Sequence, residues 1–142
     1  MGLAAAALFL VGCFEAQGTR MFELEPGDCF DNLFSDPQET RLLLRVEVVP
    51  CDEPHQKEVT AIVPVPGGDE HPGGAFFVEV VSNECPAALQ EYAGAHGEDL
   101  VGTGHFPSTN SWDLGYHWVI CVVQAADGGL LTGSVRSATN QE

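Results

Sequence analysis

The residues best suited to chemistry lie together in a short acidic turn that follows an apolar stretch. Cys51 opens this turn, Asp52 and Glu53 follow it, and His55 comes after a proline. A thiolate beside an imidazole is a typical cysteine nucleophile, and an imidazole beside carboxylates is a common set of metal ligands. The turn therefore suggests either a reactive cysteine or a metal site. In the simpler interpretation, Cys51 is a disulfide partner and His55 caps the turn.

The cysteine pattern favours the simpler interpretation. The chain has five cysteines, of which four lie in the globular part and one in an N-terminal apolar segment: Cys29, Cys51, Cys85, Cys121 and Cys13. Their wide spacing, without a Cys-x-x-Cys pair, disfavours a zinc ribbon. Four inner cysteines fit two disulfides, and the fifth cysteine, Cys13, then has a separate role. An even number of inner cysteines also argues against a free, catalytic Cys51.

The histidines and aromatic residues give only weak signals. A divalent metal could draw on His55, His71 and a carboxylate, but no His-Glu-x-x-His spacing is present, so we expect capping or surface histidines, with no metal and no other cofactor. We expect Trp112 to pack in the core, with a groove for stacking glycans as the alternative. We assign no catalytic residue. The candidate binding residues are His55, Asp52, Glu53 and Trp112.

The charge balance excludes one class of partner. Asp and Glu number 21 against 5 Lys and Arg, which gives a net charge of −16. Such a surface repels phosphate backbones, so nucleic-acid binding is not expected. It also repels anionic lipid headgroups, so we expect any membrane attachment to be covalent or hydrophobic.

The N-terminus supplies such an attachment. Residues 3–14 form an apolar run of about a dozen residues, which is too short to span a bilayer but suits the hydrophobic region of an export signal. Leu10-Val11-Gly12-Cys13 resembles the lipobox of bacterial lipoproteins, which implies that Cys13 is lipidated. No Lys or Arg precedes Arg20, as a signal would require. The chain could therefore start upstream of Met1, or the segment could be a buried apolar arm or part of a longer transmembrane helix.

The sequence patterns around these residues predict strands and helices in an α+β fold. Alternation indicates strands at residues 41–50 and 57–65, as antiparallel neighbours, and at 116–124 with a return strand at 130–136. Val59, Ala61 and Val63 are expected on one side of the second strand, and Pro64 suggests a strand edge. Residues 75–92 predict two helical pieces divided at Pro86, with a strand at 76–81 as the alternative. Residues 109–114 suggest one helical turn, 20–24 an extended stretch and 95–104 a loop. We expect a small antiparallel sheet with one or two helices packed on a face and two disulfides.

An ordered set of short motifs carries a family resemblance. They are Gly27-Asp28-Cys29-Phe30, Val49-Pro50-Cys51-Asp52-Glu53-Pro54-His55, Cys85 with Tyr92-Ala93-Gly94, Phe106-Pro107-Ser108 with Ser111-Trp112, Val119-Ile120-Cys121, and Leu131-Thr132-Gly133-Ser134-Val135-Arg136. Together, over residues 24–136, they resemble the septum-formation family of actinobacterial envelope proteins. The resemblance departs at Tyr116-His117, where the family tends to have an Asp-Arg pair, and at His71, where a tyrosine is usual.

The resemblance implies pairing of Cys29 with Cys51 and of Cys85 with Cys121, each bridge stabilising by about 3–4 kcal/mol in the chain-entropy model. We expect residues 1–19 to be a signal segment and tether, 20–136 the globular domain and 137–142 a polar tail. The predicted function is a non-enzymatic interaction or ligand-binding domain, lipid-anchored at the extracytoplasmic face of the cell membrane and connected with septum formation or envelope assembly through unidentified envelope or division proteins. The alternatives are a small envelope hydrolase or metal-dependent enzyme centred on His55, and a structural accessory domain.

Overall fold

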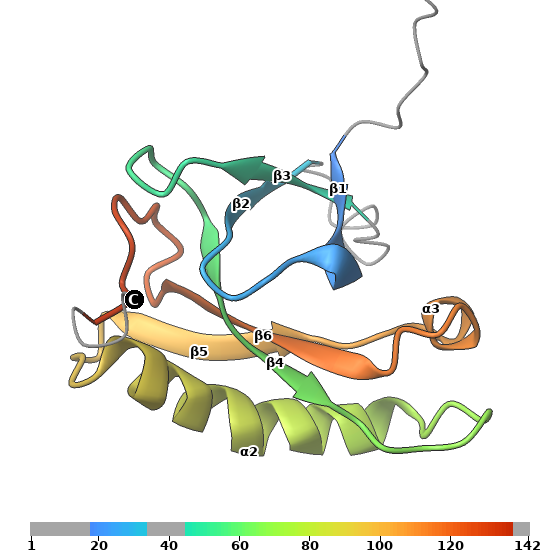
Figure 1. The fold of residues 1–142 in the computed structure, drawn as a ribbon. Helices are drawn as coiled ribbons and strands as arrows, with labels where there is room; N and C mark the ends of the chain where they lie inside the picture. Colours follow the sequence, from blue (N-terminus) through green and yellow to red (C-terminus); the bar gives the residue numbers. More distant parts are fainter. Residues whose placement is uncertain (1–17, 34–44, 138–142) are drawn as a thin grey trace, which may run out of the picture.

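The fold is built on one antiparallel sheet, seen here in a computed structural model that describes residues 18–33 and 45–137 (Figure 1). Six strands pair in the order β1-β3-β2-β4-β6-β5, and every pairing is antiparallel. The strands are β1 (Thr19–Arg20), β2 (Cys29–Asn32), β3 (Arg45–Val49), β4 (Lys57–Pro64), β5 (Leu100–His105) and β6 (Trp118–Ala125). The predicted α+β class with an antiparallel sheet is confirmed.

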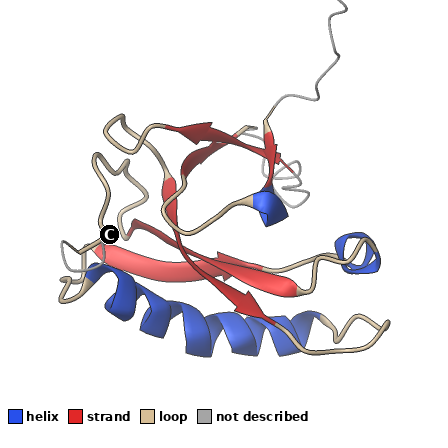
Figure 2. Ribbon diagram, viewed as in Figure 1, coloured by secondary structure: helices blue, strands red, loops and turns tan. Residues whose placement is uncertain are grey.

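Helix α2 (Gly74–Ala93) covers one face of the β4-β6-β5 half of the sheet (Figure 2). It is a single helix of 20 residues, so the predicted division at Pro86 is wrong. Proline removes one backbone hydrogen bond from a helix interior. The helix nevertheless continues because its buried side chains, including Phe77 and Leu89, hold it against the sheet on both sides of Pro86.

The strands β1, β2 and β3 curl over the opposite face, so that β6 lies between two apolar layers (Figure 1). Val119 and Cys121 pack towards α2, whereas Ile120 and Val122 pack in a second cluster with Phe30, Val46, Val59 and residues 21, 22 and 24. Covering both faces explains why β6 reads as an unbroken apolar run. The short 3-10 helix η1 (Met21–Glu23) supplies two of these core side chains, where an extended stretch was predicted.

A register shift in β4 corrects the predicted faces of that strand. The pairing with β6 is irregular between Val59 and Ala61, as in a β-bulge. Val59 therefore packs on the η1 side, whereas Ala61 and Val63 pack on the α2 side. The sequence alternation placed all three on one side, because a bulge leaves no mark in a simple period of two.

Three other features of the sheet differ from the prediction. The strands β3 and β4 are not neighbours, because β2 lies between them. Residues 95–104, predicted as a loop, contain most of the edge strand β5. The expected return strand at 130–136 is reduced to one bridge, between His55 and Leu131. The predicted helical turn near residue 112 is present as α3 (Thr109–Asp113).

The strand β5 escaped detection because it contains glycines that its packing requires. A Cβ atom on Gly102 would lie 2.7 Å from the carbonyl oxygen of Cys85, and one on Gly104 would lie 2.8 Å from the Cys85 sulfur. These glycines allow α2 to pack directly on the backbone of β5. They also lower the strand propensity of the segment.

The predicted signal segment lies almost entirely outside the described residues, as do most of the polar tail and residues 41–44 of the predicted strand. No helix in the described ranges is long and apolar enough to cross a membrane.

Candidate functional site

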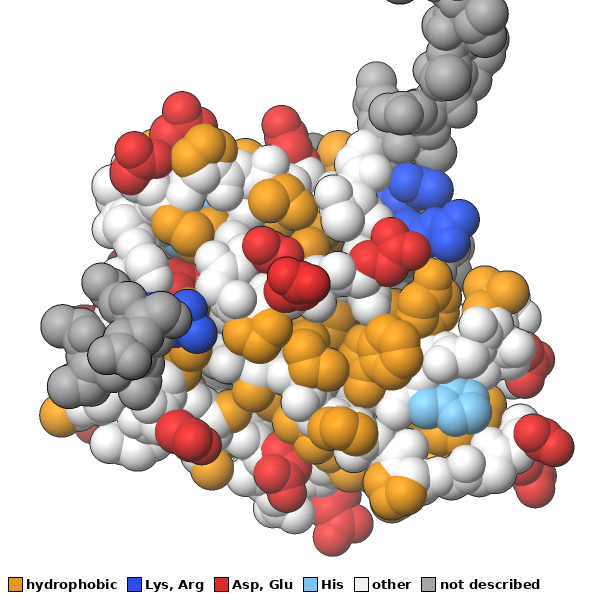
Figure 3. All heavy atoms as spheres, viewed as in Figure 1, with side chains coloured by type: hydrophobic (Ala, Val, Ile, Leu, Met, Phe, Trp, Pro, Cys, Tyr) orange, Lys and Arg blue, Asp and Glu red, His pale blue; other side chains and the backbone are white. Residues whose placement is uncertain are grey.

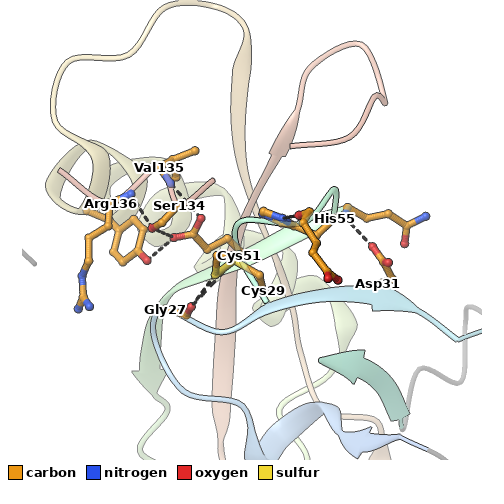
Figure 4. The surroundings of a disulfide bond; sticks show 12 residues. Gly27, Cys29, Asp31, Cys51, His55, Ser134, Val135 and Arg136 are labelled. Carbon is orange, nitrogen blue, oxygen red and sulfur yellow. Dashed lines mark hydrogen bonds between the residues drawn. A yellow bond between two sulfur atoms is a disulfide. The ribbon is translucent and has the colours of Figure 1, made fainter. Parts of the chain in front are cut away.

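The acidic turn at residues 51–55 is held by a disulfide at its first residue (Figure 4). Cys51 is bonded to Cys29 of β2, and the second disulfide joins Cys85 of α2 to Cys121 of β6. Both pairings are those implied by the resemblance. Because the sulfur of Cys51 is in a covalent bridge, the turn carries no thiolate nucleophile in this state.

His55 is completely buried and forms part of the framework. Its backbone N–H donates to the carbonyl of Leu131 at 2.9 Å, and its carbonyl accepts from the N–H of Leu131 at 2.7 Å. The ring Nδ1 lies 2.8 Å from the carbonyl oxygen of Glu53. Since a carbonyl only accepts, Nδ1 donates a hydrogen to it. No hydrogen-bond partner for Nε2 is found in the described part of the chain.

Glu58, which the sequence analysis did not single out, is the acceptor at the centre of this region. Its side chain is fully buried, and it accepts hydrogen bonds from the hydroxyl of Tyr92, the hydroxyl of Ser134 at 2.7 Å and the backbone N–H of Val135 at 3.0 Å. Burial, together with the Glu58 carboxylate, raises the pKa of Tyr92. An acid at the start of a strand looks like an ordinary surface residue in sequence, so no local signal could have identified it.

These hydrogen bonds fasten the C-terminal segment, residues 131–137, across the end of the sheet. The N–H of Gly133 donates to the carbonyl of Cys51 at 2.7 Å, and the N–H of Ser137 donates to the carbonyl of Tyr92 at 3.0 Å. The guanidinium of Arg136 lies 5.2 Å from the centre of the Tyr92 ring. Residues 131–137, which we call the clasp, are therefore held by hydrogen bonds to separate parts of the fold rather than by pairing as a strand.

One group of potential metal ligands occurs in the described residues. Ligand atoms of Cys29, His55 and Glu58 lie within 4.8 Å of one another, and all three residues are buried. The sulfur of Cys29 is in a disulfide, and the carboxylate of Glu58 already accepts three hydrogen bonds. A disulfide sulfur is a poor ligand compared with a thiolate, so only the Nε2 atom of His55 is ready to bind a metal.

The remaining candidate residues lie elsewhere. Asp52 and Glu53 are exposed on the outside of the turn. Trp112 is only 1% exposed, and its ring stacks on His117 at 3.6 Å between ring centres, so it is a core residue rather than a platform for a glycan. His71 does not join His55. Its Nε2 donates to the carbonyl of Pro107 at 2.8 Å, and its Nδ1 accepts from the N–H of Gly73 at 3.0 Å.

A second polar pair lies on the opposite face of the sheet from α2. The ammonium of Lys57 lies 3.1 Å from Nε2 of His105. Burial, and then the charge of Lys57, lower the pKa of His105 to about 3, and burial lowers the pKa of Lys57. His105 is therefore a neutral acceptor at neutral pH.

Several open clefts lie on the described surface. A cleft of about 420 Å³ lies between β4 and α2 and includes Thr60, Tyr92 and Arg136 in its walls. Another, of about 310 Å³, lies beside β1 and is lined by Arg20, Arg45 and apolar side chains.

Comparison with known proteins gives one family match. A family model described as septum formation matches residues 15–121. The matched region contains both disulfides and ends before the clasp at residues 131–137. No curated protein and no solved structure matches the chain significantly.

Proposed function

The chain belongs to the septum-formation family, and from this premise we propose that it is a membrane-anchored, non-enzymatic domain that binds a partner protein or ligand during septation or envelope assembly. Family membership supports a connection with cell division and the envelope. The mode of action is inferred from the chemistry of the turn at residues 51–55.

The observation that carries the proposal is that the reactive groups serve the fold. The four inner cysteines form two disulfides, and His55 and Glu58 are both fully buried. A catalytic group must reach its substrate, either directly or through one water molecule. Groups that are bonded, buried and already hydrogen-bonded are better suited to holding a shape.

The shape that they hold presents an acidic turn. The exposed side chains of Asp52 and Glu53 are fixed from below by the Cys29–Cys51 bridge and by the two backbone hydrogen bonds between His55 and Leu131. A preorganised turn loses little conformational freedom when it binds. This supports a binding role for Asp52 and Glu53, with a basic or hydrogen-bond-donating partner surface.

Anchoring is supported by the sequence around Cys13, where the residues Leu10-Val11-Gly12 precede the cysteine. Two or more acyl chains on this residue would give stable attachment, because each buried methylene contributes about 0.8 kcal/mol. Mass spectrometry of the membrane fraction is expected to find lipid on Cys13. An unmodified Cys13 would rule out the lipid anchor.

Partner binding is tested by quantitative crosslinking in envelope membranes. The variant Asp52→Asn/Glu53→Gln is expected to lose specific crosslinks that the parent chain forms. A matched variant, Asp69→Asn/Glu70→Gln, removes the same charge from another exposed acidic pair and is expected to keep them. Equal crosslinking by both variants would refute a role for the turn.

A second candidate function, a metal-dependent enzyme centred on His55, is favoured by the proximity of Cys29, His55 and Glu58. It predicts a stoichiometric metal in the purified protein and a loss of stability on chelation. Elemental analysis below one tenth of a metal per chain, with an unchanged melting temperature in chelator, would eliminate it.

A further inference from the structure

Two of the few basic residues in this acidic protein line the same cleft. Arg20 and Arg45 face each other as a cross-strand pair on β1 and β3, and both contribute to the cleft of about 310 Å³. Only five Lys and Arg are present in the whole chain, against 21 Asp and Glu. Figure 3 shows basic side chains gathered at β1, with acidic side chains beside them and over the rest of this face. The carboxylate of Glu23 lies 3.7 Å from the guanidinium of Arg20. Two guanidinium groups and one carboxylate therefore lie together at this end of an otherwise acidic molecule.

The same cleft is also lined by apolar side chains. Its other lining residues include Phe22, Tyr116 and Leu114, and the side chain of Leu114 is 75% exposed. The rings of Phe22 and Tyr116 stack at 5.7 Å between centres. The hydroxyl of Tyr116 accepts a hydrogen bond from the guanidinium of Arg20 at 3.4 Å. A cleft lined by both guanidinium groups and apolar side chains is complementary to a ligand that combines an anion with an apolar part.

The position of the cleft favours one such ligand. The strand β1 begins at Thr19, six residues after Cys13, so a lipid on Cys13 would hold this end of the domain within about 20 Å of the bilayer. At physiological ionic strength, charges more than about 8 Å away are largely screened. The acids on the far side of the domain therefore oppose contact with an anionic surface only weakly, although the net charge as a whole is repulsive.

We propose that the cleft lined by Arg20, Arg45, Phe22, Leu114 and Tyr116 binds the headgroup of an anionic phospholipid and seats the domain on the membrane with β1 facing the bilayer. The guanidinium groups bind the phosphate, and Leu114 inserts beside the first methylenes of the chains. The inference uses the proposed membrane location, but it concerns a contact separate from the lipid on Cys13.

The test is co-sedimentation of the full chain, purified as the unlipidated variant Cys13→Ser, with vesicles of phosphatidylcholine or of phosphatidylcholine containing one third phosphatidylglycerol. The measured quantity is the ratio of binding to the two vesicle types, because the apolar N-terminal segment contributes equally to both. A juxtamembrane arginine contributes about 1 kcal/mol, or about fivefold. Since two arginines take part, we expect phosphatidylglycerol to raise binding about 25-fold, and the rise to vanish in high salt.

The variant Arg20→Gln/Arg45→Gln is expected to abolish this rise. A matched variant on α2, Asn83→Asp/Gln90→Glu, changes the net charge by the same two units at exposed positions and is expected to retain most of it. Since Arg45 also donates to the carbonyl of Gly18 at 3.1 Å, the single variant Arg20→Gln serves as a check that requires no change at the β1–β3 pairing. It is expected to lose about half of the rise on a logarithmic scale.

The proposal would be overturned by equal binding of both vesicle types by the parent chain, or by an equal loss in the α2 variant. Competition at millimolar soluble glycerol phosphate would also overturn it, because it would identify a site for a free phosphate ester. The use of Cys13→Ser keeps these outcomes independent of the anchor. Lipid on Cys13 is tested by mass spectrometry alone and stands whether or not the cleft binds phosphatidylglycerol.

Discussion

The two disulfides join regions that are stabilised in opposite ways. Around Cys85 and Cys121, the neighbours are apolar side chains such as Phe77 and Val119, packed between α2 and the sheet. Around Cys29 and Cys51, the neighbours are the buried polar groups of His55 and Glu58, held by directional hydrogen bonds. The first region tolerates a change of shape better than a change of polarity, whereas the second depends on every donor having its acceptor.

The largest expected effect tests the polar region. Glu58→Ala leaves the hydroxyls of Tyr92 and Ser134 and the N–H of Val135 without their acceptor, and we expect a loss of about 3–5 kcal/mol in the free energy of unfolding, measured with urea. Glu84→Ala, at an exposed position on α2, is expected to change it by less than about 0.5 kcal/mol. Similar values for both variants would contradict the role of Glu58.

Removal of each disulfide compares the two regions directly. The sequence separations of 36 and 22 residues correspond to losses of about 3.8 and 3.4 kcal/mol in the chain-entropy model. We expect Cys85→Ala/Cys121→Ala to destabilise more than Cys29→Ala/Cys51→Ala, because it also removes buried apolar contacts. Chemical denaturation of both variants under non-reducing conditions gives the order. A reversed order would show that the polar region depends more on its bridge.

A smaller effect tests how closely α2 approaches β5. Gly102→Ala places a Cβ atom 2.7 Å from the carbonyl oxygen of Cys85 and is expected to cost about 1–3 kcal/mol. Gly97→Ala is the control, because no heavy atom lies within 4 Å of its added Cβ. Equal melting temperatures for the two variants would mean that the helix moves away from the strand without cost.

The smallest effect concerns Lys57 and His105. The unfolded chain takes up a proton on His105 below about pH 6.5, whereas the folded chain excludes it down to about pH 3. Stability is therefore fully present above pH 6.5 and falls as the pH is lowered, by up to about 1.4 kcal/mol per pH unit. His105→Gln is expected to lose about 1 kcal/mol less than the parent chain between pH 7 and 5.5. Parallel stability curves would disprove the shift.

The sequence predicts the apolar region far better than the polar one. Alternation and cysteine count indicated β4, β6 and the two disulfides, because burial of apolar side chains leaves a periodic pattern. The bulge between Val59 and Ala61 and the glycine-containing strand β5 depend on contacts with distant segments, which no local pattern records. The partners of Glu58 come from α2 and from residues 134 and 135, so this site could not be assembled before the fold was known.

The candidate site shows the same division. The sequence directed attention to His55 and Trp112 because of their residue types, yet both are fully or almost fully buried. The pair of Arg20 and Arg45, which are 25 positions apart in the chain, became a candidate only when β1 and β3 were seen to align.

The clasp formed by residues 131–137 has a consequence for the order of events during biosynthesis. The acceptor oxygens of Glu58, in the middle of the chain, receive two of their three donors only from Ser134 and Val135, near its end. A nascent chain that stops short of these residues lacks two of the hydrogen-bond donors to Glu58. Burying the carboxylate without them is costly, so we expect Glu58 to stay in contact with water until they are present. The polar region around Glu58 therefore forms only after residues 134 and 135 have been synthesised, and a truncation that removes them should be more harmful than their position on the surface suggests.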